Sequence, residues 1–137
     1  MGKCYEMVSS FKRKYPLTIA FRLSKHCEII EKHLNPDEEI LYAFPAQKNP
    51  NVFEFFYTNV IALTNKRIMI ATKRVLWGYF LTTVTPELFN DLKVQSGLIF
   101  GRVIIDTAKE LIIVSNLGKG SLKEVETAIS TYMNKYT

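Results

Sequence analysis

The sequence has few cysteines and no long uncharged segment, and each absence excludes a class of protein. Cys4 and Cys27 are the only cysteines, which is too few for a disulfide scaffold or a cysteine-rich zinc site. The longest segment without a charged residue, residues 75–86, has 12 residues, whereas a membrane-spanning helix needs about 20. Hydrophobic residues make up 47% of the 137 residues and charged residues 23%, so a single folded domain with its own core is expected.

Catalytic motifs are also missing. The sequence contains no G-x-S-x-G, H-E-x-x-H or G-x-G-x-x-G segment. Residues 118–121, Gly-Lys-Gly-Ser, match only part of a phosphate-binding loop, and we interpret them as a turn followed by a helix cap. His26 and His33 lie two helical turns apart, about 10 Å along a helix axis, too far apart for one zinc ion. We therefore expect no enzyme, no cofactor and no bound metal, and we place both histidines at the surface or partly buried.

The positive charge is concentrated at the start of the chain. Residues 1–25 contain six basic residues and one acidic residue, whereas residues 26–137 contain twelve of each. A basic segment of this kind either lies solvated against the body of the protein or attracts phosphates and anionic membranes. Glu6 and residues 12–14 interrupt the apolar run that a secretion signal needs, so a cytoplasmic protein is expected, with the inner membrane face as a second location.

The same segment predicts an amphipathic helix. Cys4, Val8, Phe11 and Tyr15 recur at helical spacing, and Pro16 ends the helix. One interpretation docks this apolar face on the rest of the protein. The other lays the helix in a membrane interface, with Val8, Phe11 and Tyr15 inserted and three basic residues facing anionic headgroups, namely Lys12, Arg13 and Lys14.

The rest of the chain predicts a second helix, seven strands and a last helix. The second helix spans about residues 25–35, with Ser24 as its N-cap. Residues 45–51 read as a loop, and the last helix follows a capping box formed by Ser121 and Glu124. The strands are expected near residues 39–44, 55–63, 67–72, 76–85, 92–95, 98–106 and 111–114.

Several of these strands are apolar on both faces. Val60 and Ile61 are adjacent, and residues 103–105 and 111–114 are continuous apolar runs. Because neighbouring strand residues point to opposite sides, one face of each strand fills the core and the other needs a separate cover. The N-terminal helices or a second subunit would provide it.

The order of these segments resembles the bacterial pleckstrin-homology-like (PH-like) domains. Residues 34–41, Leu-Asn-Pro-Asp-Glu-Glu-Ile-Leu, are similar to the entry into their first strand. Residues 62–70 resemble their second hairpin, with Thr64 and Arg67 around a polar turn. Residues 84–104 resemble the run into a later hairpin, and the C-terminal helix fits the helix that fills the barrel. The likeness covers residues 34–137 and is nearest to the YokE-like group, so residues 1–33 form a basic helical N-terminal extension.

The resemblance implies a mainly β, α+β fold: a seven-stranded, partly open antiparallel barrel capped by one C-terminal helix. It also implies a non-catalytic binding or assembly module that acts through protein contacts, including homo-oligomerisation. The alternative is peripheral association with an anionic membrane through the first helix.

Eukaryotic relatives of this fold bind inositol phosphates through basic residues around the first hairpin. Here Glu54 follows Lys48, and residues 55–63 contain no basic residue, so specific phosphoinositide binding is not expected. Lys73 and Arg74 lie near Trp77 and Tyr79, a mixture seen in nucleic-acid sites, but the neutral body argues against a nucleic-acid partner. The candidates for contact with an anionic surface are therefore Lys12, Arg13, Lys14, Lys48, Lys73 and Arg74.

Overall fold

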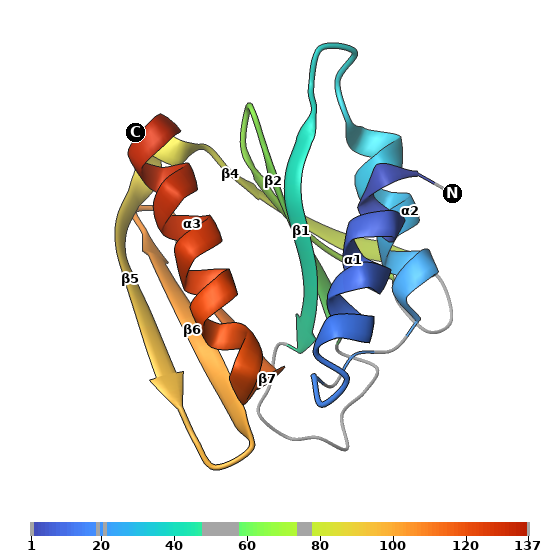
Figure 1. The fold of residues 1–137 in the computed structure, drawn as a ribbon. Coiled ribbons are helices and arrows are strands. Elements are labelled where there is room, and N and C mark those ends of the chain that lie inside the picture. Colours follow the sequence, from blue (N-terminus) through green and yellow to red (C-terminus); the bar gives the residue numbers. More distant parts are fainter. Residues whose placement is uncertain (1, 19, 21, 48–57, 74–77, 137) are drawn as a thin grey trace.

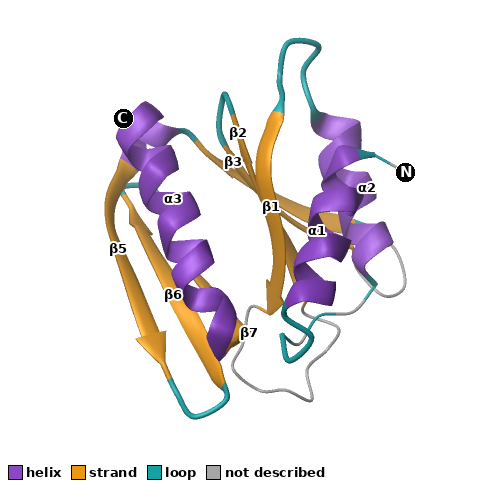
Figure 2. Ribbon diagram, in the orientation of Figure 1, coloured by secondary structure: helices purple, strands orange, loops and turns teal. Residues whose placement is uncertain are grey.

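The computed structural model describes residues 2–18, 20, 22–47, 58–73 and 78–136, and it contains three α-helices and seven strands within them (Figures 1 and 2). The helices are α1 (Lys3–Lys14), α2 (Leu23–His33) and α3 (Leu122–Tyr136). The strands are β1 (Ile40–Gln47), β2 (Thr58–Thr64), β3 (Ile68–Lys73), β4 (Tyr79–Val84), β5 (Phe89–Ser96), β6 (Phe100–Thr107) and β7 (Leu111–Gly118). Two short 3-10 turns, η2 (Pro86–Leu88) and η3 (Lys119–Ser121), precede β5 and α3.

The strands form one strongly curled antiparallel sheet in the order β4-β3-β2-β1-β7-β6-β5. The two halves of this sheet meet between β1 and β7, where Gln47 pairs with Ser115. In the sheet as described, β4 and β5 are the two edges, so the barrel is partly open. Helix α3 lies against the β5–β6 side (Figure 1). The expected α+β fold, with seven antiparallel strands, a C-terminal helix and N-terminal helices, is confirmed.

The main core fills the concave side of the curled sheet. Helix α3 contributes Leu122, Val125, Ile129 and Tyr132, which recur at the spacing of one helix face. The sheet contributes alternate residues to the same core: Phe44, Ile61, Leu63, Ile68, Val103, Ile105, Ile112 and Val114. Gly101 on β6 allows the close approach of α3, because a Cβ there would lie 2.4 Å from Leu122 Cδ1.

A second core lies on the convex side of β1, β2 and β3, under α1 and α2. Strand β2 is buried along its whole length because it serves both cores. Ile61 faces the main core, whereas Val60 and Ala62 face the second, where they meet Val8 of α1 and Ile30 of α2. Of the two covers that the sequence left open for this face, the structure uses the N-terminal helices.

The two helices are also held to each other and to the sheet. Glu31 of α2 caps α1, because its Oε1 accepts a hydrogen bond of 2.8 Å from the Cys4 main-chain N–H. Lys3 Nζ lies 3.1 Å from Glu39 Oε1, just before β1. Cys4 and Cys27 are buried free thiols in the second core, and the hydrogen bond between them, together with burial, raises the pKa of Cys4.

Three local predictions were wrong. Helix α2 begins two residues earlier than expected, and its N-cap is Arg22 with a left-handed φ of 57°, so Ser24 lies inside the first turn. Residues 45–47, predicted as loop, extend β1. Pro45 is tolerated there because β1 pairs with β7 only at Gln47, which leaves one side of the strand unpaired at the proline. Strand β7 continues past residue 114 to Gly118, which pairs with Phe100.

Candidate interaction surfaces

The apolar face of α1, predicted either to dock or to insert into a membrane, packs inward. Val8 is fully buried in the second core, and Phe11 is 3% exposed beside Phe44. Tyr15 is half-buried against Phe11, with ring centroids 5.0 Å apart. In this arrangement the side chains expected to enter a bilayer are already used by the fold.

The basic residues at the end of α1 have different roles. Lys12 Nζ donates to the carbonyl oxygens of Pro16 and Thr18 and so closes the turn that follows the helix. Burial lowers the pKa of Lys12. Arg13 is exposed. Lys14 is exposed as well, but its Nζ lies 2.6 Å from Glu124 Oε1 on α3.

The remaining predicted cations are not gathered with these. Lys73 ends β3 beside the start of α2, where its N–H donates to His26 Nδ1 at 2.8 Å and its carbonyl accepts from Arg22. Lys48 and Arg74 lie outside the described residues. Of the residues predicted to contact an anionic surface, Lys12, Arg13 and Lys14 therefore lie together at the end of α1. Lys73 lies apart from them, at the contact between α2 and β3.

The two histidines serve the fold. His26, expected at the surface or partly buried, is fully buried and accepts the Lys73 hydrogen bond. His33 Nε2 lies 3.1 Å from the Tyr79 hydroxyl. Among the described residues no group of three or more His, Cys, Asp or Glu side chains is placed to hold a metal ion.

The predicted capping box at the start of α3 is replaced by contacts with other elements. Ser121 Oγ donates to the Gly118 carbonyl, within the turn η3. Glu124 instead accepts hydrogen bonds from Lys14, from the Tyr15 hydroxyl at 3.0 Å and from the Tyr42 hydroxyl at 2.7 Å. Burial opposes ionisation of Glu124, but these donors outweigh it and lower its pKa. Residues 118–121 are thus a structural turn, and Glu124 joins α3 to α1 and β1.

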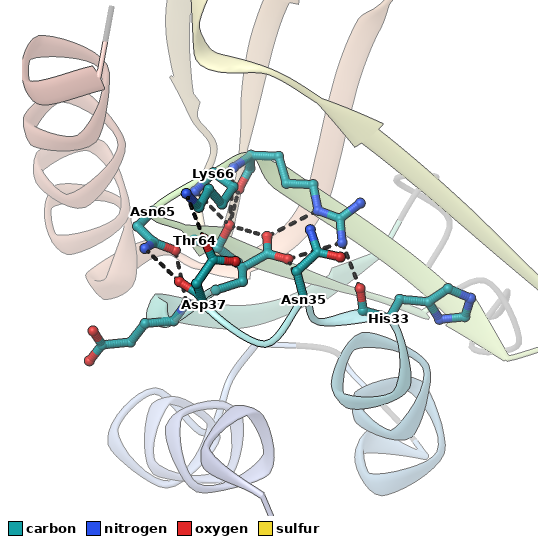
Figure 3. Close-up of polar contacts among 9 residues, drawn as sticks. His33, Asn35, Asp37, Thr64, Asn65 and Lys66 are labelled. Carbon is teal, nitrogen blue, oxygen red and sulfur yellow. Dashed lines mark hydrogen bonds and ion pairs between the residues drawn. The ribbon is translucent and has the colours of Figure 1, made fainter.

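The polar turn that carried the resemblance, Thr64 to Arg67, forms a buried network with the segment before β1 (Figure 3). The Thr64 hydroxyl donates to Glu38 Oε2 at 2.5 Å, and its oxygen accepts the N–H groups of Lys66 and Arg67. Arg67 also donates to the His33 carbonyl oxygen at the end of α2. All of these groups are satisfied internally, so the network fixes the fold and offers no ligand site.

A surface with three apolar side chains among polar ones remains on the outside of β5, β6 and β7. Alternation with the core residues places eight side chains there, which we call the β5–β7 outer face: Asp91, Lys93, Gln95, Arg102, Ile104, Asp106, Leu111 and Ile113. Ile104 and Ile113 are paired across the strands and half-buried, and Leu111 is 57% exposed. The sequence indicated this surface through the two continuous apolar runs.

Lys93 lies opposite Ile104 in the middle of this face, and the other charges lie toward its two ends. Asp91 and Asp106 are paired directly opposite each other on β5 and β6, beyond one end of the isoleucine pair. Arg102 lies beyond the other end and donates to Gln95 Oε1 at 2.5 Å. Like charges opposite each other on antiparallel strands destabilise the pair, so this acidic end favours a cation from outside.

A shallow hollow of about 280 Å³ adjoins the Arg102 end of the face. Its described lining residues are Gln95, Ser96, Gly97, Phe100, Gly101, Arg102, Ser115 and Asn116. This lining contains no carboxylate, histidine or cysteine, so it offers no acid–base pair. Over the described ranges, no helix has the length and apolar character needed to cross a membrane.

Comparison with known proteins gives one match. The family model of the bacterial PH domain matches residues 34–131. No curated protein and no solved structure matches the chain.

Proposed function

The chain belongs to the bacterial PH domain family, and on that premise we propose that it is a non-catalytic assembly module whose β5–β7 outer face binds a second copy of the same chain. Bacterial PH domains are generally non-catalytic binding modules. The YokE-like grouping stays a prediction.

The observation that carries the proposal is the half-buried isoleucine pair on the β5–β7 outer face, over which neither α1 nor α2 lies. The sequence predicts two doubly apolar regions, and the helices α1 and α2 cover only the one on β1, β2 and β3. Ile104 and Ile113 lie on the other region, beside the exposed Leu111. Removing such side chains from water favours association in proportion to the apolar area buried.

The charges favour a two-fold pair in one orientation. In a symmetric dimer each patch meets its own copy, so a face must be complementary to itself. If the strands of the two copies ran parallel, Asp106 would meet the partner copy's Asp106. If they run antiparallel, Asp106 meets the partner's Arg102 while the isoleucine pairs stack in the centre. The second arrangement matches Asp106 with Arg102 twice. Lys93 lies in the isoleucine row and comes near the partner's Lys93, but it is exposed on the edge strand, so both ammonium groups reach water at the rim.

Sedimentation equilibrium measures this self-association. We expect the native chain to form dimers in the micromolar range and Ile104→Asp to be monomeric there. The matched control is Leu41→Asp, which places the same charge at another exposed apolar position, 39% exposed at the start of β1. Circular dichroism checks that each variant is folded. A native chain that stays monomeric at high micromolar concentration would overturn the proposal.

Charge reversal tests the orientation. Asp106→Arg and Arg102→Asp should each weaken the dimer by about tenfold, because each places like charges together twice in the pair. Mixing the two variants should restore dimers, since each Arg at position 106 then meets an Asp at position 102 and the native Arg102 meets the native Asp106. Variants that dimerise like the native chain, or whose mixture fails to form the mixed dimer, would contradict this orientation.

A further inference from the structure

The hairpin between β5 and β6 ends in two exposed apolar residues. Leu98 is 95% exposed and Ile99 is 54% exposed. The Gly97 N–H donates to the Phe100 carbonyl at 2.8 Å, which makes Leu98 and Ile99 the two central residues of a tight turn. Neither residue has a positive φ, so the turn backbone accepts ordinary residues, and side chains this exposed gain little from packing within the turn. The turn itself therefore does not explain why Leu98 and Ile99 are apolar.

A third exposed apolar residue lies at the same end of the molecule. Leu17, in the turn after α1, is 61% exposed. The Lys119 N–H donates to the Ile99 carbonyl at 2.9 Å, and a Cβ on the adjacent Gly118 would lie 3.6 Å from Leu17 Cβ. Residues 118–119 thus link the α1 turn to the hairpin, and Figure 1 shows the ends of α1, the β5–β6 hairpin and the start of α3 together at this end.

Exposed cations lie on the elements that meet at this end of the molecule. Arg13, at the end of α1, and Lys119 of η3 are both exposed. Lys123 of α3 is 88% exposed, and its Nζ is 4.0 Å from Glu126 Oε1. The other carboxylate on this first part of α3, Glu124, is already bound by Lys14 and two tyrosines. We call this region the hairpin-end surface: Arg13, Leu17, Leu98, Ile99, Lys119 and Lys123.

We propose that the hairpin-end surface docks on an anionic lipid bilayer. Leu98 and Ile99 enter the interface between headgroups and acyl chains, and Arg13, Lys119 and Lys123 lie against the anionic headgroups. Exposed apolar side chains together with exposed cations supply the two terms that hold peripheral proteins on membranes, apolar burial and attraction to anionic lipid. This function goes beyond self-association and leaves α1 packed in the fold.

The proposal differs from insertion of α1 in the side chains it uses. Val8 and Phe11 would have to leave the two cores before they could reach lipid. Leu98 already points away from both cores, so docking needs no unfolding. In the antiparallel dimer proposed above, the two β5–β6 hairpins point in opposite directions. A dimer therefore docks on one bilayer through the hairpin-end surface of one copy only.

Flotation of the full chain with vesicles tests the proposal. We expect the native chain to float at low salt with phosphatidylcholine vesicles in which about one lipid in three is the anionic phosphatidylglycerol. We expect it not to float with phosphatidylcholine alone, and to be released from the anionic vesicles at high salt. Failure of the native chain to float on the anionic vesicles would overturn the proposal.

Two sets of variants identify the surface. Leu98→Asp/Ile99→Asp should reduce the bound fraction by at least about tenfold, because it removes the apolar contact and adds two anionic charges. Arg13→Glu/Lys119→Glu should have a comparable effect at low salt. The controls are Leu41→Asp for the apolar change and Lys32→Glu for the charge change, since Lys32 is exposed on α2.

The outcomes separate this proposal from self-association. Flotation of Leu98→Asp/Ile99→Asp at the native level would overturn the hairpin-end surface as the docking site. Ile104→Asp is measured in the same series, and we expect it to float as the native chain does. If it loses flotation while the hairpin variants keep it, binding depends on the β5–β7 outer face, and the hairpin proposal is wrong.

Discussion

Glu38 and Arg67 form a two-point ion pair that joins the segment before β1 to the turn between β2 and β3. Arg67 Nε lies 3.0 Å from Glu38 Oε2, and Arg67 Nη2 lies 3.0 Å from Glu38 Oε1. The Glu38 side chain is completely buried, and that of Arg67 is 22% exposed. Burial opposes ionisation of Glu38, but the hydrogen bonds from Arg67 and Thr64 outweigh it and lower its pKa. The Glu38 carboxylate is therefore charged and closed off from solvent, and its counter-charge is Arg67.

Removing one partner of this pair should destabilise the fold strongly. Arg67→Ala leaves the Glu38 carboxylate buried without its counter-charge, a change that costs about 3 kcal/mol in the free energy of unfolding. Urea denaturation followed by circular dichroism measures this. The matched control is the adjacent Lys66→Ala, because Lys66 pairs with Asp37 at 3.1 Å on the exposed surface, where the loss has little effect. Equal effects of the two substitutions would contradict the buried pair.

Acid should remove the contribution of Glu124. Its pKa is lowered in the folded state, so its stabilisation is present above the unfolded glutamate pKa of about 4.3 and is lost as pH falls through the lower folded pKa. Glu124→Gln should therefore be less stable than the native chain by about 1 kcal/mol at neutral pH. The difference should shrink as the pH falls below the unfolded glutamate pKa of about 4.3.

The measurement is the urea midpoint across this pH range. Glu126→Gln, two residues further along α3, is the control, since Glu126 is 45% exposed and 4.0 Å from its lysine. A gap between the native chain and Glu124→Gln that stayed constant with pH would show that the carboxylate charge is not what stabilises this contact.

Helix α1 should be required for the stability of the sheet that it covers. Val8→Asp buries an unpaired carboxylate in the second core, and we expect a loss of about 3 kcal/mol or more in the free energy of unfolding. Ser10→Asp is the control on the exposed side of the same helix. Thermal unfolding of the two variants checks this. If Val8→Asp melted with Ser10→Asp, α1 would be free of the sheet in solution, and its insertion into membranes would return as an explanation.

The sequence determined the elements of this fold. Periodicity located α1 through Cys4, Val8 and Phe11, and Pro16 marked its end within two residues. The same pattern located α3, and the polar turn at residues 64–67 located the hairpin of β2 and β3. These features are local, because helical spacing and turn chemistry act over a few residues. The family, and with it the curled antiparallel sheet, followed from their order.

Only the tertiary structure decided what each surface is used for. The sequence left α1 free either to dock or to insert, and it showed two doubly apolar regions without saying which one the helices cover. It assigned Glu124 to a helix cap, whereas Lys14, Tyr15 and Tyr42 reach that carboxylate from segments up to 110 residues away in the chain. Such contacts depend on how the sheet curls and which edges it leaves open. The hydrophobic pattern and the charges of a segment indicate only that one of its faces is buried or paired. Which segment covers that face depends on how distant parts of the chain pack together.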